Sequence, residues 1–257
     1  MNSENKEIKV EESRDFLELN KEKEEIYFKK SPNHLSTLRL NDTKEIDIKL
    51  EDNSNEIVNL LLDNNYEKLS INIDINENSN LDFYIGDIAD ESSILSLNLN
   101  VSGENSSVNF HVASLAENDQ KKKYLLNVNH LNPNSNSLID FNGVSKNNAE
   151  IRVDAVSFVK ENMHKTNANQ KVRIILMDKE AKGLAKPILK IDHNDIKASH
   201  ACAIGNLKED DLYYLLSRGL NVNDAKKLIT LGYLLPITQK FDEESKNKFV
   251  EYVGGKI

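Results

Sequence analysis

The residues of this sequence that could do chemistry lie close together near residue 200. The stretch KASHACAIGNLKEDDLYYLLSRGL, residues 197–220, contains the only cysteine, Cys202, two positions after His200. Side chains two positions apart in a strand point to one face, so this pair shares a face with Ala198 and Ile204. Imidazole and thiolate both bind metals, and the pair is therefore a candidate metal or iron–sulfur site.

A single thiol limits what such a site can hold. Iron–sulfur clusters are typically held by four thiolates, so we expect this chain to hold no cofactor stably by itself. The imidazole of His200 and, secondarily, the thiolate of Cys202 are the ligands that this chain could supply to a metal site. The alternatives are a hydrogen-bonded structural histidine and a buried cysteine that acts as a small apolar side chain. The remaining histidines show no ligand spacing and are expected to be structural or exposed: His34, His111, His130, His164 and His193.

Length and composition favour a globular protein of the reducing cytoplasm. A chain of 257 residues can bury a large core without disulfides, and one cysteine cannot form an internal disulfide. The polar N-terminus has no apolar signal segment, and the longest mostly apolar run, 228–237, is too short to span a bilayer. The net charge of −9 argues against a nucleic-acid partner, and the basic cluster 121–123 is expected to be a solvated loop.

The pattern of apolar residues divides the chain into three zones. Residues 1–65 form a charged N-terminal segment that we expect to be partly helical, with helices after Ser13 and over 57–62. Residues 66–205 alternate apolar and polar positions in about ten short runs, which is typical of a β-sandwich, barrel or solenoid. Hairpin dipeptides are scarce between these runs, and this favours a solenoid.

Residues 206–257 have the period of helices. Asn206 is placed to cap the first helix and Gly219 to end it, and Asn221 is placed to cap the second, which Pro236 stops. A third helix is expected over 242–253. Apolar, aromatic and arginine side chains on or beside the first helix could bind a partner. The candidates are Leu212, Tyr213, Tyr214, Arg218 and Gly219.

A series of fixed positions across the strand-to-helix junction resembles a known family. Lys186-Pro187, Leu189 and Ile191 are followed by Asp195-Ile196-Lys197, His200, Gly205, Tyr214-Leu215 and Ser217-Arg218-Gly219. This series is similar to the C-terminal signature of the SufB/SufD family of iron–sulfur cluster assembly scaffolds, and closer to the SufD branch. The resemblance covers about 166–236. Within it, Ala198 stands where cysteine is frequent, and Ala201 stands where glycine is usual.

The resemblance implies a fold and a function. The fold is a right-handed parallel β-helix, here over 66–205, followed by a small C-terminal α-helical docking domain, with a reduced N-terminal helical region. The implied function is that of a non-catalytic scaffold that docks a SufC-type ATPase through its C-terminal helices. Its β-helix would pair with a SufB-like chain or with itself, and a cluster would be shared in the complex.

Two other functions are compatible with the same pattern. A structural homodimeric β-solenoid would bind a partner without any cluster role. A carbohydrate-active β-helix enzyme would need paired carboxylates in a groove, but the acidic residues lie mostly in connections and there is no tryptophan to stack on a sugar. We therefore expect that the chain is not itself an enzyme.

Overall fold

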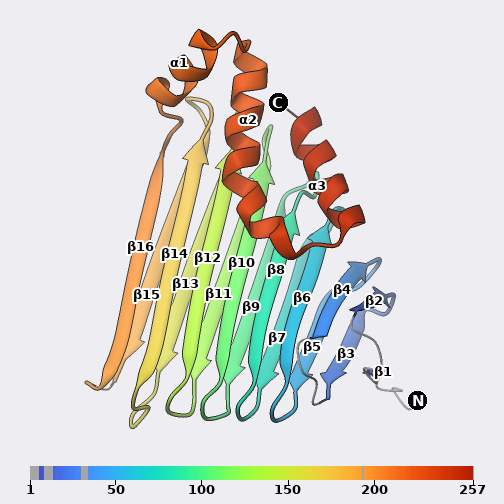
Figure 1. The fold of residues 1–257 in the computed structure, drawn as a ribbon, viewed down its shortest axis with the longest axis vertical. Coiled ribbons are helices and arrows are strands. Elements are labelled where there is room, and N and C mark those ends of the chain that lie inside the picture. The colour runs from blue at the N-terminus through green and yellow to red at the C-terminus, as the bar shows by residue number, and fades with distance from the viewer. Residues whose placement is uncertain (1–5, 9–13, 30–33, 193, 257) are drawn as a thin grey trace.

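The structure is a computed structural model that describes residues 6–8, 14–29, 34–192 and 194–256. The chain winds into a coil of parallel strands and ends in helices (Figure 1). Alternate strands belong to two eight-stranded parallel sheets, so each inner strand pairs with the strands one turn before and one turn after it. The mainly β, parallel β-solenoid fold is therefore confirmed.

The odd-numbered strands form sheet A and the even-numbered strands form sheet B. Sheet A comprises β1 (Lys6–Ile8), β3 (Lys23–Phe28), β5 (Glu45–Leu50), β7 (Lys68–Ile75), β9 (Ser93–Val101), β11 (Lys121–His130), β13 (Glu150–Val159) and β15 (Lys182–Ile191). Sheet B comprises β2 (Arg14–Leu19), β4 (His34–Leu40), β6 (Asn55–Leu62), β8 (Asn80–Asp87), β10 (Ser107–Ala116), β12 (Asn136–Ser145), β14 (Thr166–Leu176) and β16 (Ile196–Asn206). The helical part comprises α1 (Glu209–Ser217), α2 (Val222–Leu234), the 3-10 helix η1 (Leu235–Lys240) and α3 (Glu243–Gly255).

The coil widens from its N-terminal to its C-terminal end. Lys23 pairs with Glu45, 22 residues along the chain, whereas Glu150 pairs with Lys182, 32 residues along. The strands lengthen in step, from 6 residues in β2 to 11 in β16. A repeat whose length keeps changing has no fixed period, and this explains why no internal repeat is evident in the sequence.

Tight turns between the sheets account for much of the asparagine. Asn53, Asn78, Asn105 and Asn134 occupy successive turns and have positive φ angles of 64°, 54°, 57° and 55°. Asparagine tolerates the left-handed region better than most residues because its short amide can hydrogen-bond locally. These four asparagines thus mark corners of the coil.

The two helices expected in the N-terminal zone are strands instead. Residues 14–19 form β2 and residues 55–62 form β6, both paired within sheet B. The prediction for β6 was wrong because both faces of this strand are buried. Leu60 and Leu62 face the core inside the coil, while Leu61 packs beneath the C-terminal helices. Consecutive apolar residues therefore hid the period of two.

The basic cluster 121–123 begins strand β11 and is not a solvated loop, so that prediction was also wrong. The Nζ of Lys122 lies 2.8 Å from Asp87 Oδ1, and both side chains are fully buried. The hydroxyl groups of Tyr124 and Tyr66 donate to Asp87 Oδ2 at 2.7 and 2.6 Å. A charge can be buried when it is paired and hydrogen-bonded in this way. The alternation of β11, which directs Lys122 inward, thus outweighs the polarity of the side chain.

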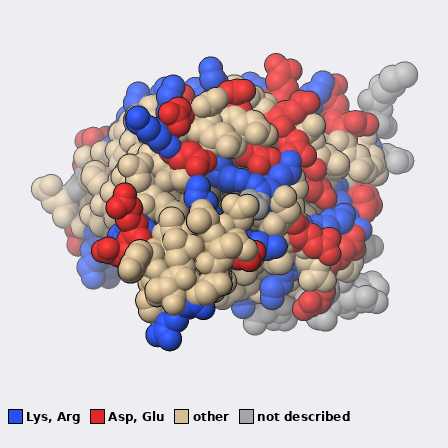
Figure 2. Space-filling model, turned by 90° about the horizontal axis from the view of Figure 1, so that it is seen from above, with Lys and Arg blue, Asp and Glu red and all other residues tan. Residues whose placement is uncertain are grey.

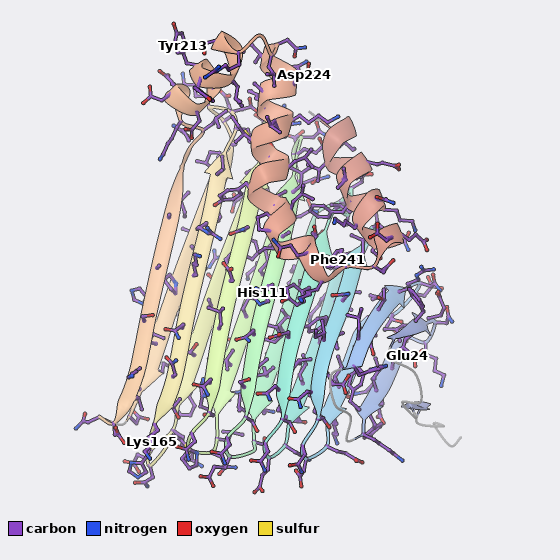
Figure 3. The ribbon with its side chains drawn as sticks, viewed as in Figure 1. Glu24, His111, Lys165, Tyr213, Asp224 and Phe241 are labelled. Carbon is purple, nitrogen blue, oxygen red and sulfur yellow. The ribbon has the colours of Figure 1, made fainter. Side chains whose placement is uncertain are left out.

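The C-terminal helices lie against the outer face of sheet B (Figure 1). A second apolar cluster joins Leu115 and Val144 of the sheet to Leu234, Phe241 and Phe249 of the helical part. Figure 3 shows Phe241 at the turn between η1 and α3, over the sheet. No helix in the described part of the chain is long and apolar enough to cross a membrane.

The helix ends follow the expected signals with one exception. Asn221 and Asp242 cap α2 and α3, accepting hydrogen bonds from the backbone N–H groups of Asp224 and Ser245. Gly219 follows α1 with φ +93°, as expected of a glycine just past a helix end. Asn206 does not cap α1, because it is the last residue of β16 and α1 starts after Lys208.

Candidate functional site

The wide end of the coil, formed by β15 and β16, exposes the inside of the coil. Each of these strands has a hydrogen-bonded neighbour on one side only. In β14 the inward-facing Ala168 and Val172 are buried. Their in-register neighbours in β16 are less covered, since Ala198 is half-buried and Cys202 is exposed. No further turn of the described chain covers this layer. The last turn therefore presents its interior side chains and two strand edges to its surroundings.

His200 and Cys202 lie on this exposed interior face. Their neighbours in register in β14 are Gln170 and Val172, both of which point into the coil and are buried. The expectation that the two side chains share a face is confirmed, but the alternative of a buried cysteine is not, since Cys202 is exposed. Partial desolvation raises the pKa of the Cys202 thiol above its ordinary value. A metal would have to displace the thiol proton in order to bind there.

This chain offers few metal ligands. In the ranges that the structure describes, no group of three or more His, Cys, Asp and Glu side chains is arranged to hold a metal ion. His200 and Cys202 can supply at most two ligands between them. A cluster at this face would need its remaining ligands from another chain.

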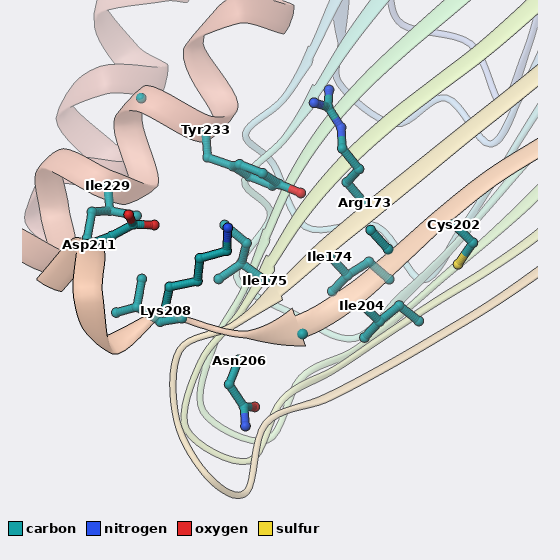
Figure 4. A pocket seen from close by; sticks show the side chains of 14 residues that line it. Arg173, Ile174, Ile175, Cys202, Ile204, Asn206, Lys208, Asp211, Ile229 and Tyr233 are labelled. Atoms are coloured by element: carbon teal, nitrogen blue, oxygen red, sulfur yellow. The ribbon is translucent and has the colours of Figure 1, made fainter.

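A cleft of about 640 Å³ lies between β16 and the helices, next to the exposed face (Figure 4). Cys202, Ile204 and Ile229 contribute to its lining, together with Tyr233 and Arg173. The Arg173 guanidinium lies 5.7 Å from the centre of the Tyr233 ring. Burial raises the pKa of Tyr233 to about 12, so the phenol stays neutral at ordinary pH. The cleft is thus mainly apolar, with the charged side chains of Arg173, Lys208 and Asp211 also in its lining.

Helix α1 carries the candidate partner-binding residues. None of its residues is buried, and the side chains of Tyr213 and Tyr214 are 74% and 56% exposed. Tyr213 lies at the outer end of the helical part, at the top of the view in Figure 3. The guanidinium of Arg218 lies 5.3 Å from the centre of the Tyr214 ring. Leu212 is half-buried, and Gly219 is exposed at the end of the helix.

Seen from the helical end, the surface mixes both signs of charge around an uncharged patch (Figure 2). This pattern differs from the clustered cations that bind nucleic acid. It is compatible with a protein partner, whose binding surface usually combines an apolar centre with a polar rim.

The other histidines are accounted for by their surroundings. His34 and His130 are buried within the coil and hydrogen-bonded, and His111 stacks on Tyr84 with ring centres 4.5 Å apart. His164 is partly exposed beside Asp195. His193 lies outside the described residues.

Gln170 is a residue at this site that sequence reasoning missed. It lies directly beneath His200, one turn earlier in the coil, and is 2% exposed. The pair is separated by 30 positions in the sequence, and only a known repeat length could have brought the two residues together.

Comparisons with known proteins point to one family. The family model described as "SUF system FeS cluster assembly, SufBD core domain" matches residues 47–233. The iron–sulfur cluster assembly protein SufD of Bacillus subtilis is 27% identical over 180 residues, which cover 70% of this chain and 41% of that protein. A SufBD family protein of Staphylococcus haemolyticus is 21% identical over 170 residues, which cover 66% of this chain and 37% of that protein. This chain therefore spans about two fifths of the length of these relatives.

Proposed function

Because the chain belongs to the SufBD family of iron–sulfur cluster assembly proteins, we propose that it is a SufD-like, non-catalytic scaffold subunit. In this proposal it works in the cytoplasm, pairs through the wide end of its coil with a SufB-like chain or a second copy, and docks a SufC-type ATPase through α1. An iron–sulfur cluster is the cargo of the assembly, not a resident group of this chain.

The uncovered wide end is the observation that carries the proposal. Strand edges have unpaired N–H and C=O groups, and proteins usually cover or block them. Here β15 and β16 combine two such edges with inward-facing apolar side chains that are only partly buried or exposed, among them Leu189 and Ile204. A second coil placed against this end would satisfy the edges and bury the apolar atoms in one step.

At that junction, His200 and Cys202 would face the partner chain. A histidine nitrogen from this chain and thiolates from a SufB-like chain could together hold a cluster during assembly. Cys202 would add a thiolate only after losing its proton. His200 is therefore the leading shared ligand of this chain, and Cys202 is the second candidate.

The exposed residues of helix α1 are the argument for docking of the ATPase there. Aromatic and arginine side chains are enriched among residues that dominate binding energy, and Tyr213, Tyr214 and Arg218 are exposed together on this helix. A protein gains no internal stability from leaving two tyrosines in water. Binding of a partner that buries the two rings would be favoured by their removal from water.

Co-expression tests the scaffold role most directly. The full chain is co-expressed with SufB-like and SufC-like proteins, and the purified product is examined anaerobically for mass and iron content. We expect a complex containing all three chains, and we expect His200→Ala to lower its iron content. If the chain stays alone at every ratio, the scaffold proposal fails. An unchanged iron content in the His200→Ala complex would remove only the ligand role, leaving a structural partner.

Docking through α1 is tested by the double variant Tyr214→Ala, Arg218→Ala. We expect it to lose most binding to the ATPase in a pull-down while the circular dichroism spectrum is unchanged. Asn247→Ala, an exposed position on the docked helix α3, is the matched control and should bind normally. Retention of the ATPase by the folded double variant at the level of the control would exclude α1 as the docking surface.

A further inference from the structure

Gln170 has a buried oxygen atom without a hydrogen-bond partner. Its Nε2 donates to Ser157 Oγ at 2.9 Å and to the backbone oxygen of Ile188 at 3.1 Å. Its Oε1 is buried and has no hydrogen-bond partner among the described residues. A buried acceptor left without a donor costs about 1–3 kcal/mol, so such an atom needs an explanation.

The orientation of this amide is fixed by its contacts. A backbone oxygen can only accept a hydrogen bond, so the group that faces Ile188 must be the NH₂ of Gln170. Exchanging the oxygen and the nitrogen would bring two acceptors together. The unpartnered atom is therefore an oxygen, and it requires a donor.

Of the two in-register neighbours of Gln170 in sheet B, one has a side-chain donor. Within sheet B, Gln170 lies in register with Ile139 on one side and with His200 on the other. Isoleucine has no polar atom in its side chain, whereas an imidazole ring always carries at least one N–H group. Adjacent strands are about 4.8 Å apart, which places the ring within reach of the amide.

The same chain already contains such a pair. His34 and Glu56 are in-register neighbours inside the coil, and His34 Nδ1 lies 3.0 Å from Glu56 Oε2. Glutamine has the shape of glutamate and carries the same kind of acceptor oxygen. Gln170 and His200 share the in-register placement of that pair, at the wide end, where the histidine is exposed instead of buried.

We propose that Gln170 is a positioning residue for His200. Its Oε1 accepts a hydrogen bond from one ring N–H, which selects a single tautomer and directs the other ring nitrogen, with its lone pair, toward the partner chain. A hydrogen bond of this kind commonly fixes the orientation of metal-binding histidines. The part that concerns a metal rests on the function proposed above, whereas the hydrogen bond itself does not.

The tautomer of His200 gives the first test. The ring nitrogens of the ¹⁵N-labelled full chain are observed by long-range proton–nitrogen NMR at neutral pH. We expect one dominant tautomer in the wild type and in the control Lys171→Ala, whose side chain points to the outer face of the same strand. Gln170→Leu, which removes the acceptor, should give a mixture of tautomers. A wild-type chain with mixed tautomers overturns the proposal without any variant, and so does a folded Gln170→Leu chain with the wild-type tautomer.

Iron retention gives the second test and separates the two proposals. In the anaerobically prepared complex, Gln170→Leu should weaken iron retention by about 10-fold or more, the usual effect of losing a group that orients a metal ligand. Wild-type retention in this variant, together with a loss in His200→Ala, would contradict the positioning role. If His200→Ala also retains iron while the tautomer still depends on Gln170, the ligand role fails and the hydrogen bond stands.

Discussion

The helical part of the molecule contacts the coil in two different ways. Helices α2 and α3, with η1 between them, pack on sheet B through a shared apolar cluster that includes the fully buried Phe249 and Leu234. Helix α1 packs on α2 and has no buried residue of its own. All three α-helices have amphipathic sequences, and α1 is the shortest with 9 residues against 13 in α2 and in α3, but only α2 and α3 pack on the coil through this cluster.

The difference lies in the sheet surface beneath the helices. Gly86 and Ala113 lie on the outer face of sheet B, where small residues let the rings of Phe241, between η1 and α3, and of Phe249 in α3 approach closely. A β-carbon at Gly86 would lie 3.0 Å from the Phe241 ring. Helix α1 lies beyond the covered region, at the end of β16, and finds no such surface. A short helix is marginal by itself, so α1 depends on its packing against α2 and, in the function proposed above, on a partner.

Truncating Phe249, a large side chain of α3 that is buried against sheet B, should have the largest effect on stability. We expect Phe249→Ala to reduce the free energy of unfolding by about 3–5 kcal/mol, because it leaves a cavity between α3 and the sheet. Urea unfolding followed by circular dichroism measures the loss. A reduction below about 1 kcal/mol would mean that α3 is held no better than α1.

The cap of α3 should matter next and should depend on pH. Burial opposes ionisation of Asp242, but hydrogen bonds from Ser245 and Thr37 outweigh it and lower the pKa of the carboxyl group. The stabilisation is therefore complete above the unfolded-state pKa of about 3.9, and it is lost as the pH falls through the lower folded-state value. We expect Asp242→Ala to cost about 1–2 kcal/mol at pH 7.

Urea unfolding of wild type and Asp242→Ala at a series of pH values checks this prediction. The difference in the free energy of unfolding between the two proteins should be constant from pH 7 to about pH 5 and should decrease below about pH 4. A gap that widens on acidification would show that the carboxylate destabilises the docked helix.

Asn221 caps α2 at the junction with α1, so its removal should have a smaller effect. We expect Asn221→Ala to cost about 1 kcal/mol, because the backbone N–H of Asp224 loses its acceptor. Thermal unfolding is a suitable measurement, with Asn221→Asp as a conservative control that keeps an acceptor. Equal melting temperatures for wild type and Asn221→Ala would show that α2 is fixed by its packing alone.

The smallest effect on stability is expected in α1. Tyr213→Ala should change the free energy of unfolding by no more than about 0.5 kcal/mol, because the side chain is mostly in water. The same urea titration as for Phe249 makes the comparison direct. A loss above 1 kcal/mol would mean that α1 is part of the folded core, and the contrast between the two regions would disappear.

Much of the middle of the coil can be predicted from its sequence. The alternating runs 70–75, 95–101 and 108–112 lie within β7, β9 and β10, because one face of each strand is buried and the other is not. The cap at Asn221 and the start of the third helix near residue 242 also follow from local signals and were predicted correctly. The N-terminal strand β6 was not, since helices far along the chain bury its second face.

The candidate site could be predicted only in part. The shared face of His200 and Cys202 follows from the period of a strand, but their exposure does not, because it depends on where the stack of turns ends. The proximity of Gln170 to His200 depends on the length of one particular turn. Burial of Lys122 required its partner Asp87, which is 35 residues away in sequence.

The increase in turn length along the coil makes the molecule a cone with a narrow tip and a broad base. The base is formed by β15 and β16, which no further turn of the described chain covers. Two subunits joined there would share the largest cross-section that either can offer. Two cones joined base to base form a spindle with its broadest section at the middle. In such a spindle His200 lies at the waist, as far from both tips as the shape permits, while the helices of both subunits remain outside on the flanks.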